Sequence, residues 1–123
     1  MSTKIKLGIL GYGNLGKATE LSIKANEDMK LIAIFTRRNP SELKPQTDTQ
    51  IISINELLNY KDKIDILILC GGSATDLPYQ TPEFAKNFNV IDSFDTHAKI
   101  PEHFSKVNIS AKETNHIALI SCG

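Results

Sequence analysis

The chain has 123 residues, which is the length of one domain and is enough to bury a hydrophobic core. Its formal net charge is zero, so it has neither the basic field that holds nucleic acid nor an acidic tail. No apolar stretch approaches the roughly 20 residues of a membrane span, and the short apolar N-terminal run leads into glycines without the cleavage site of a signal peptide.

The first half of the chain alternates short apolar runs with helical patterns. Strands are predicted at 4–10, where both faces should be buried, and at 31–36 and 51–52. A helix is predicted at 14–25, where a rough apolar stripe consists of Leu15, Ala18, Leu21 and Ile23. The segment 39–50, with two prolines, is predicted to be a loop. A second helix begins at Ser53 or Asn55 and ends at Tyr60, with Leu57 and Leu58 facing inward.

The second half continues the alternation. The run from Ile64 to Cys70 is almost wholly apolar, as expected of a central parallel strand. Thr81-Pro82-Glu83 has the residue types of a helix N-terminus and predicts a helix that ends at Phe88. A strand at 89–92, a helix at 102–113 and a strand at 116–121 complete the chain.

This order of elements predicts an α/β fold, a doubly wound parallel sheet of Rossmann type with helices on both faces. Residues 1–123 are predicted to form one domain. Ligands of this architecture lie at the carboxyl ends of the strands, and the sequence stops just after a strand. We therefore expect a fragment or a shortened gene product that lacks the part closing the site.

A glycine-rich motif follows the first predicted strand directly. Its residues are Gly11, Tyr12, Gly13, Asn14, Leu15 and Gly16. The first glycine permits a tight turn, the second lets the backbone approach a pyrophosphate, and the third allows close packing of the following helix. The N-terminus of that helix offers free N–H groups to phosphates. The motif predicts a dinucleotide site, and the alternative is a glycine turn without a ligand.

Two arginines follow the second strand, where an acidic residue would hold the ribose 2′-hydroxyl of NAD. The segment Thr36-Arg37-Arg38 begins 20 residues after Gly16. Arginine binds phosphate in a bidentate manner, and the threonine hydroxyl can add a hydrogen bond. The segment therefore predicts a 2′-phosphate site and NADP as the cofactor. The alternative is a solvated basic pair on the surface.

Polar segments also follow the fourth and fifth predicted strands. The segment 70–76 should border the ribose and nicotinamide, and the alternative is a strand-end turn capped by serine or threonine. Cys70 is expected to be a packing residue rather than a nucleophile, because no histidine partner is near it in the sequence. In the segment 92–97, Asp92, Asp95 and His97 are candidates for substrate contact, and the alternative is that the aspartates cap a loop.

No metal site is predicted. His103 and His116 show no clustering with other ligand types and are expected to be structural or surface residues. Cys70 and Cys122 form neither a metal-binding nor a redox motif, and we expect reduced thiols in a cytoplasmic protein.

Taken together, these segments resemble the N-terminal cofactor domain of the meso-diaminopimelate D-dehydrogenases. The matching stretches are 11–16, Ile-Phe-Thr-Arg-Arg at 34–38, Leu-Cys-Gly-Gly-Ser-Ala-Thr-Asp at 69–76 and Asp-Ser-Phe-Asp-Thr-His at 92–97. The resemblance implies reversible oxidative deamination of the D-amino centre of meso-2,6-diaminopimelate with NADP, in the supply of lysine and peptidoglycan precursors.

The resemblance also implies roles for individual residues. Tyr12, Asn14 and Leu15 would line the pyrophosphate turn, and Thr36, Arg37 and Arg38 would hold the 2′-phosphate. The residues facing the ribose and nicotinamide would be Cys70, Gly72, Ser73 and Thr75. Asp95 would be the catalytic residue, beside the reacting amino group.

The family continues after the last strand with a Trp-Asp-Pro-Gly segment and a substrate and dimerisation domain, which this sequence does not contain. We therefore expect a homodimeric parent enzyme and little or no turnover by this chain alone. Two alternatives remain. One is the cofactor domain of another NAD(P)-dependent reductase, resembling dihydrodipicolinate reductase or a sugar dehydrogenase. The other is a stand-alone nucleotide-binding module.

Overall fold

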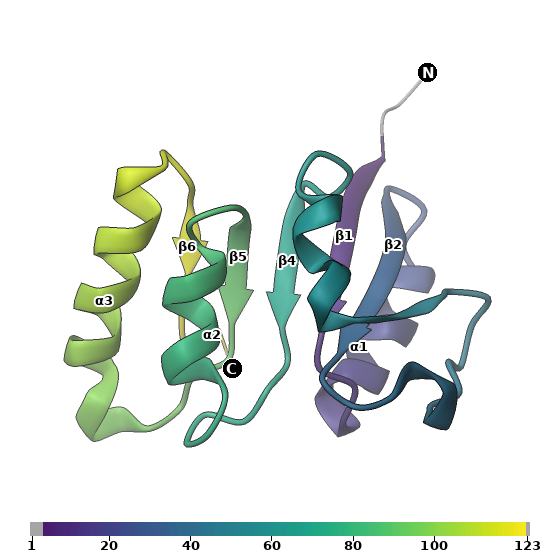
Figure 1. The fold of residues 1–123 in the computed structure, drawn as a ribbon, viewed down its shortest axis with the longest axis horizontal. Coiled ribbons are helices and arrows are strands. Elements are labelled where there is room, and N and C mark those ends of the chain that lie inside the picture. The colour runs from purple at the N-terminus through teal and green to yellow at the C-terminus, as the bar shows by residue number, and fades with distance from the viewer. Residues whose placement is uncertain (1–3, 123) are drawn as a thin grey trace.

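The computed structural model, which describes residues 4–122, contains a six-stranded sheet in the order β3-β2-β1-β4-β5-β6. The strands are β1 Ile5–Leu10, β2 Met29–Thr36, β3 Ile51–Ser53, β4 Ile66–Leu69, β5 Asn89–Asp92 and β6 Ala118–Leu119. Every neighbouring pair is parallel. The chain starts in the middle at β1, proceeds to one edge, crosses back to β4 and ends at the other edge (Figure 1). This order confirms the predicted doubly wound fold.

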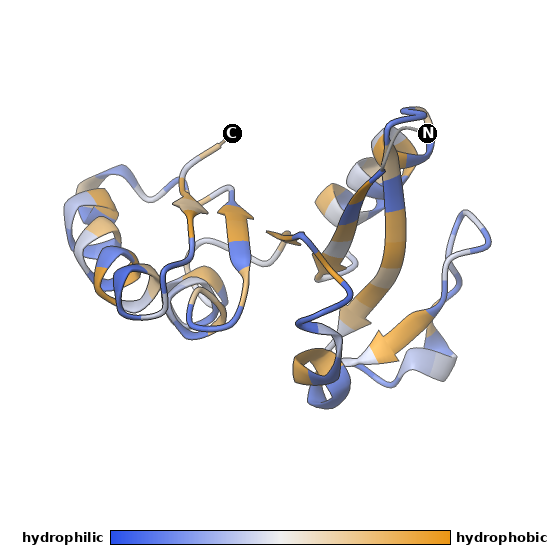
Figure 2. Ribbon diagram, turned by 90° about the horizontal axis from the view of Figure 1, so that it is seen from above, coloured by the Kyte–Doolittle hydropathy of each residue, from blue (hydrophilic) through white to orange (hydrophobic). Residues whose placement is uncertain are grey.

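Helices cover both faces of the sheet. The α-helices are α1 Asn14–Lys24, α2 Leu77–Phe84 and α3 Ile100–Glu113, and the 3₁₀ turns are η1 Pro40–Glu42, η2 Ile54–Tyr60 and η3 His97–Lys99. In Figure 1, α1 lies behind the sheet, whereas η2, α2 and α3 lie in front of it. The larger core lies on the front face and includes Phe35, Leu67 and Val90. Figure 2 shows the most hydrophobic colours concentrated along the strands. No helix within residues 4–122 is long and apolar enough to span a bilayer.

The predicted apolar stripe of α1 is largely wrong. Leu15 and Leu21 are 46% and 50% exposed, whereas Glu20 is fully buried. Ile23 alone of the predicted stripe faces the core, where it belongs to the cluster of Leu7 and other residues on this face. The stripe was irregular, and the true inward face carries a charged residue, so apolar periodicity could not locate it.

The strand β4, predicted from the apolar run at 64–70, is not equally buried on its two faces. Its side chains alternate, with Leu67 and Leu69 buried on the front face and Ile66 and Ile68 half-buried on the other. The main contacts of α1 are with β2 and β1, so this face of β4 is less covered than the front face. An apolar run predicts a strand, but the exposure of each face depends on which helices reach it.

The predicted start of the helix at Thr81 is also wrong. The helix α2 begins at Leu77, and Pro82 lies inside it. Thr81 is buried, and its hydroxyl donates a hydrogen bond of 2.7 Å to Asp92 Oδ2 instead of capping a helix. Pro78 is the proline near the true N-terminus, because complete burial of Leu77 starts the helix earlier.

The prediction that Leu57 and Leu58 both face inward is half correct. The turn η2 buries Leu57 but leaves Leu58 52% exposed.

Candidate dinucleotide-binding site

A cleft of about 450 Å³ opens at the carboxyl ends of β1, β2 and β4. Among the predicted cofactor residues, those that line it are Gly11, Tyr12, Gly13, Thr36, Arg37, Arg38, Cys70 and Gly72. Thus the glycine turn, the arginine pair and the turn after β4 meet in one place. The predicted residues outside this lining are Asn14, Leu15, Gly16, Ser73, Thr75 and Asp95.

The three glycines of the first turn serve different purposes. Gly11 has a φ of +103°, which side-chain-bearing residues rarely adopt. A Cβ on Gly16 would collide with the carbonyl of Gly11, so this glycine lets α1 start directly against the turn. Gly13 differs from both, because its backbone is extended and a Cβ there would have no neighbour within 4 Å. Nothing in the described chain requires a glycine at this position, and the space beside it is open to a ligand.

The N-terminus of α1 is not capped by a side chain. Gly13 is its N-cap residue, and the first helix turn contains no acidic residue. The N–H groups at the start of a helix carry a partial positive charge and bind phosphates when no cap occupies them. This end of α1 therefore offers donors directly beside the open position at Gly13.

The two arginines point to different partners. Arg38 donates from Nη2 to the main-chain oxygen of Tyr12 at 3.3 Å, and its own N–H donates to Thr36 Oγ1 at 3.0 Å. Arg37 instead reaches across the cleft, where its Nη2 lies 2.5 Å from Oδ1 of Asp76. Two guanidiniums therefore stand at one end of the cleft, with no other carboxylate among its lining residues.

Behind the glycine turn lies a buried carboxylate that sequence reasoning missed. Glu20, on the inward face of α1, accepts hydrogen bonds from the Tyr12 hydroxyl, from the hydroxyl and N–H of Thr47, and from the N–H of Gln46. These contacts connect the turn, α1 and the loop before β3. Nothing in the spacing marks Glu20, because its loop partners are 26 and 27 residues further along the chain.

The same hydrogen bonds set the protonation of the pair. Burial raises the pKa of Glu20, but the hydrogen bonds from Thr47, Tyr12 and Gln46 outweigh burial and hold the pKa below its ordinary value. Burial and the neighbouring carboxylate raise the pKa of the Tyr12 hydroxyl. Glu20 is therefore an ionised acceptor at neutral pH and Tyr12 a neutral donor.

Asp92 is a structural residue, and its candidacy for substrate contact is wrong. The side chain is 1% exposed. Its two oxygens accept hydrogen bonds from Thr81 Oγ1, the Phe94 N–H and the Ser121 N–H, and Nε2 of the buried His103 lies 2.7 Å away. The alternative, that an aspartate caps this loop, is correct for Asp92. This network joins the carboxyl ends of β5 and β6 to α2 and α3.

Asp95 lies on the exposed part of the same loop. Its N–H donates to Ser73 Oγ at 2.8 Å, so the turn after β4 and the loop after β5 are directly connected. Asp95, Thr75 and His97 are exposed, and none of them lines the cleft. This hydrogen bond therefore holds Asp95, the predicted catalytic residue, beside the segment 70–76 that is predicted to border the nicotinamide.

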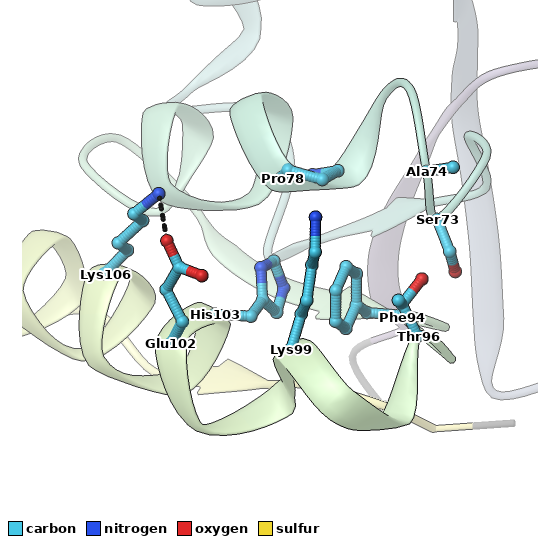
Figure 3. Close-up of a pocket in the computed structure, with 9 residues that line it drawn as sticks. All are labelled: Ser73, Ala74, Pro78, Phe94, Thr96, Lys99, Glu102, His103 and Lys106. Atoms are coloured by element: carbon cyan, nitrogen blue, oxygen red, sulfur yellow. Dashed lines mark ion pairs between the residues drawn. The ribbon is translucent and has the colours of Figure 1, made fainter.

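A second cavity, of about 250 Å³, lies between α2 and α3 next to this loop (Figure 3). The ring of Phe94 stacks on His103 with their centroids 4.0 Å apart. Lys106 and Glu102 form an ion pair of 3.2 Å at its rim. Ser73 also lines this cavity, so one hydroxyl borders both the cavity and the Asp95 loop. Within residues 4–122, no group of three or more His, Cys, Asp or Glu side chains is placed to hold a metal ion.

The two cysteines differ in a way that alkylation can test. Cys70 is buried beside Thr19, and burial raises the pKa of its thiol, whereas Cys122 is exposed. We expect iodoacetamide to modify Cys122 at least about tenfold faster than Cys70 at pH 8, because the thiolate is the reactive form and Cys70 forms it less readily. Mass spectrometry of the folded protein measures both rates. The two rates should become similar after denaturation, and equal rates in the folded protein would contradict the burial of Cys70.

The strand order and the glycine turn at the carboxyl end of β1 define this chain as a Rossmann-type domain with a cleft at the carboxyl ends of its central strands. No family model matches it. A meso-diaminopimelate D-dehydrogenase of Acetivibrio thermocellus is 54% identical over 121 residues, which are 98% of this chain and 36% of that protein.

Solved structures of related dehydrogenases are also similar to this chain. An engineered D-amino acid dehydrogenase bound to NADP+ superimposes with a TM-score of 0.90 at 39% identity, over 98% of this chain and 37% of that one. The diaminopimelate dehydrogenase of C. glutamicum in complex with DAP has a TM-score of 0.89 at 39% identity, over the same shares. The chain is thus homologous to meso-diaminopimelate D-dehydrogenases, as the sequence motifs indicated, and spans little more than a third of their length.

Proposed function

We propose that this chain is the NADP-binding domain of a meso-diaminopimelate D-dehydrogenase. The observation that carries the proposal is the meeting of an uncapped helix N-terminus, an open position at Gly13 and two guanidiniums in one cleft. The similarity to an NADP+-bound relative over 98% of the chain supports the same cofactor. Substrate binding and dimerisation belong to the remaining part of a longer, cytoplasmic parent enzyme, which acts as a homodimer.

The residues present fit this cofactor. A Cβ at Gly13 would project into open space where a pyrophosphate can approach, and the N–H groups of 14–16 would donate to it. Arg38 and Arg37 would hold the 2′-phosphate, with Thr36 supporting the Arg38 backbone. NADP+ bound in this way supplies the hydride acceptor for the D-configured carbon of diaminopimelate.

The turn after β4 and the loop after β5 carry the remaining roles. Cys70, Gly72, Ser73 and Thr75 would face the ribose and nicotinamide. Ser73 accepts a hydrogen bond of 2.8 Å from the Asp95 N–H, which would keep the cofactor side of the site close to the substrate side. Asp95 would stand beside the reacting amino group as a charged partner for the substrate ammonium. This carboxylate is exposed in the chain and free to meet a substrate.

Gly13→Ala is the sharpest test, because it separates binding from folding. In the free chain the methyl group meets nothing within 4 Å and the backbone is extended, so the variant should fold. Alanine is a poorer N-cap than glycine but restricts the unfolded chain, so the free energy of unfolding should change by no more than about 1 kcal/mol. A pyrophosphate on the turn would collide with the methyl group, so we expect the affinity for NADP+ to fall at least about tenfold. Calorimetric titration with NADP+ and NAD+ measures the affinity.

Ser22→Ala serves as the control, since it adds no atom to the cleft and lies on the exposed side of α1. It should bind NADP+ as the natural chain does. Unchanged NADP+ affinity in Gly13→Ala would show that the pyrophosphate does not bind at this turn. Failure of the natural chain to bind either nucleotide would refute the proposed function.

A further inference from the structure

One ion pair crosses the proposed cofactor cleft. Arg37 leaves the end of β2, and its guanidinium meets the carboxylate of Asp76 in the turn after β4. Both residues line the cleft, and the distance from Nη2 to Oδ1 is 2.5 Å. Oδ1 nevertheless makes no hydrogen bond of proper geometry, so the contact is an ion pair alone. In the function proposed above, Arg37 binds the 2′-phosphate. The phosphate and the Asp76 carboxylate would therefore compete for one guanidinium.

The carboxylate is the fixed member of this pair. Asp76 Oδ2 accepts a hydrogen bond of 2.9 Å from the Gly72 N–H, and the Asp76 N–H donates to the Gly72 oxygen at 2.9 Å. A Cβ on Gly71 would lie only 2.7 Å from the Asp76 Cβ, so the turn is closed tightly over this side chain. Leu77, the next residue, is fully buried and anchors α2.

The guanidinium is the movable member. The Arg37 side chain is 64% exposed, against 14% for Asp76. Ion pairs with an exposed partner contribute little to stability. A phosphate offers a guanidinium stronger, bidentate, charge-assisted hydrogen bonds than a single misaligned carboxylate oxygen does. Exchange of Arg37 from Asp76 to a phosphate is therefore favourable, and it needs only rotation of an exposed side chain.

We propose that Asp76 is a specificity-determining counter-ion that the cofactor's 2′-phosphate displaces from Arg37. The inference rests on the proposed function. NAD+ carries a 2′-hydroxyl in place of the phosphate and leaves the ion pair intact. Binding of NADP+ therefore includes the cost of breaking the pair and of placing a phosphate near a carboxylate, whereas binding of NAD+ does not. Asp76 thus lowers the preference for NADP+ below the value that the two arginines alone would give.

The test is Asp76→Asn, which removes the charge and keeps the shape. The amide oxygen still accepts the hydrogen bond from Gly72, so the turn is preserved. We expect NADP+ to bind about three- to fivefold more tightly and NAD+ to bind unchanged, at one fixed ionic strength. Asp48→Asn, which removes an exposed carboxylate paired with Lys24 and outside the cleft, should change neither affinity.

A double-mutant cycle with Arg37→Ala separates exchange from simple charge repulsion. If Arg37 moves to the phosphate, the gain from Asp76→Asn should shrink to less than about twofold in the Arg37→Ala background. An undiminished gain in the Arg37→Ala background would overturn the proposal, because the ion pair would then be irrelevant to NADP+ binding. Weaker NADP+ binding by Asp76→Asn would also overturn it, because the ion pair would then be retained in the complex. Asp76→Ser, which can still cap the turn, provides the same measurement if the Asn variant does not fold.

The proposed function and this inference fail in different ways. If the natural chain binds neither nucleotide, the proposed function is refuted. If it binds NADP+ and the ratio of the two affinities is the same in Asp76→Asn, only the inference is refuted.

Discussion

Replacement of both Arg37 and Arg38 by alanine should abolish the preference for NADP+. A hydrogen bond to a charged group contributes about 1.5–3 kcal/mol, so the loss of two guanidiniums should weaken NADP+ binding by about 100-fold or more. The affinity for NAD+ should change less than about threefold, because its 2′-hydroxyl does not need a cation. Calorimetric titration of both nucleotides checks the prediction.

The single variants should differ. Arg38 contacts only a carbonyl oxygen at 3.3 Å with its guanidinium, whereas Arg37 must first leave Asp76. Arg38→Ala should therefore cost more NADP+ affinity than Arg37→Ala. Lys24→Ala, which removes an exposed cation paired with Asp48 outside the cleft, is the matched control and should leave both affinities unchanged. Equal losses for NADP+ and NAD+ would mean that the arginines support the turn rather than the 2′-phosphate.

Replacement of Glu20 should have the largest effect on stability. Glu20→Ala takes this acceptor from the Tyr12 hydroxyl and from the hydroxyl and N–H of Thr47, and it leaves the Gln46 N–H with the Tyr12 oxygen alone. Each unsatisfied buried group costs about 1–3 kcal/mol, and water entering the space recovers part of this, so we expect a loss of about 3–5 kcal/mol. Glu20→Gln keeps one oxygen acceptor and should lose about 1–2 kcal/mol. Urea denaturation measures both.

The pH dependence of stability should identify the same residue. The pKa of Glu20 in the folded chain lies below its ordinary value of 4.5, so the unfolded chain takes up the proton first on acidification. The stabilisation is thus complete above about pH 4.5 and is lost as the pH falls through the folded pKa. We expect a steeper acid loss of the unfolding free energy in the natural chain than in Glu20→Gln. Identical slopes would show that folding does not lower the pKa of this carboxylate.

Much of the fold was predictable because its signals are local. The apolar runs located β1, β2 and β5, and the glycine motif located the turn between β1 and α1. The order of strands and helices then left few topologies, since parallel strands need crossovers of one hand. The start of α2 was missed because two prolines compete for the helix start, and burial of Leu77 decided between them.

The sequence by itself determined the class of fold, the position of the glycine turn and the two arginines, because each depends on residue types at short spacing. Tertiary structure alone decided which polar groups meet. It paired Arg37 with Asp76 across the cleft, joined Glu20 to a distant loop, and buried Asp92 against His103 while leaving Asp95 exposed. Two aspartates in one short segment look alike in a sequence. Their roles separate only when a folded chain surrounds one with donors and leaves the other in solvent.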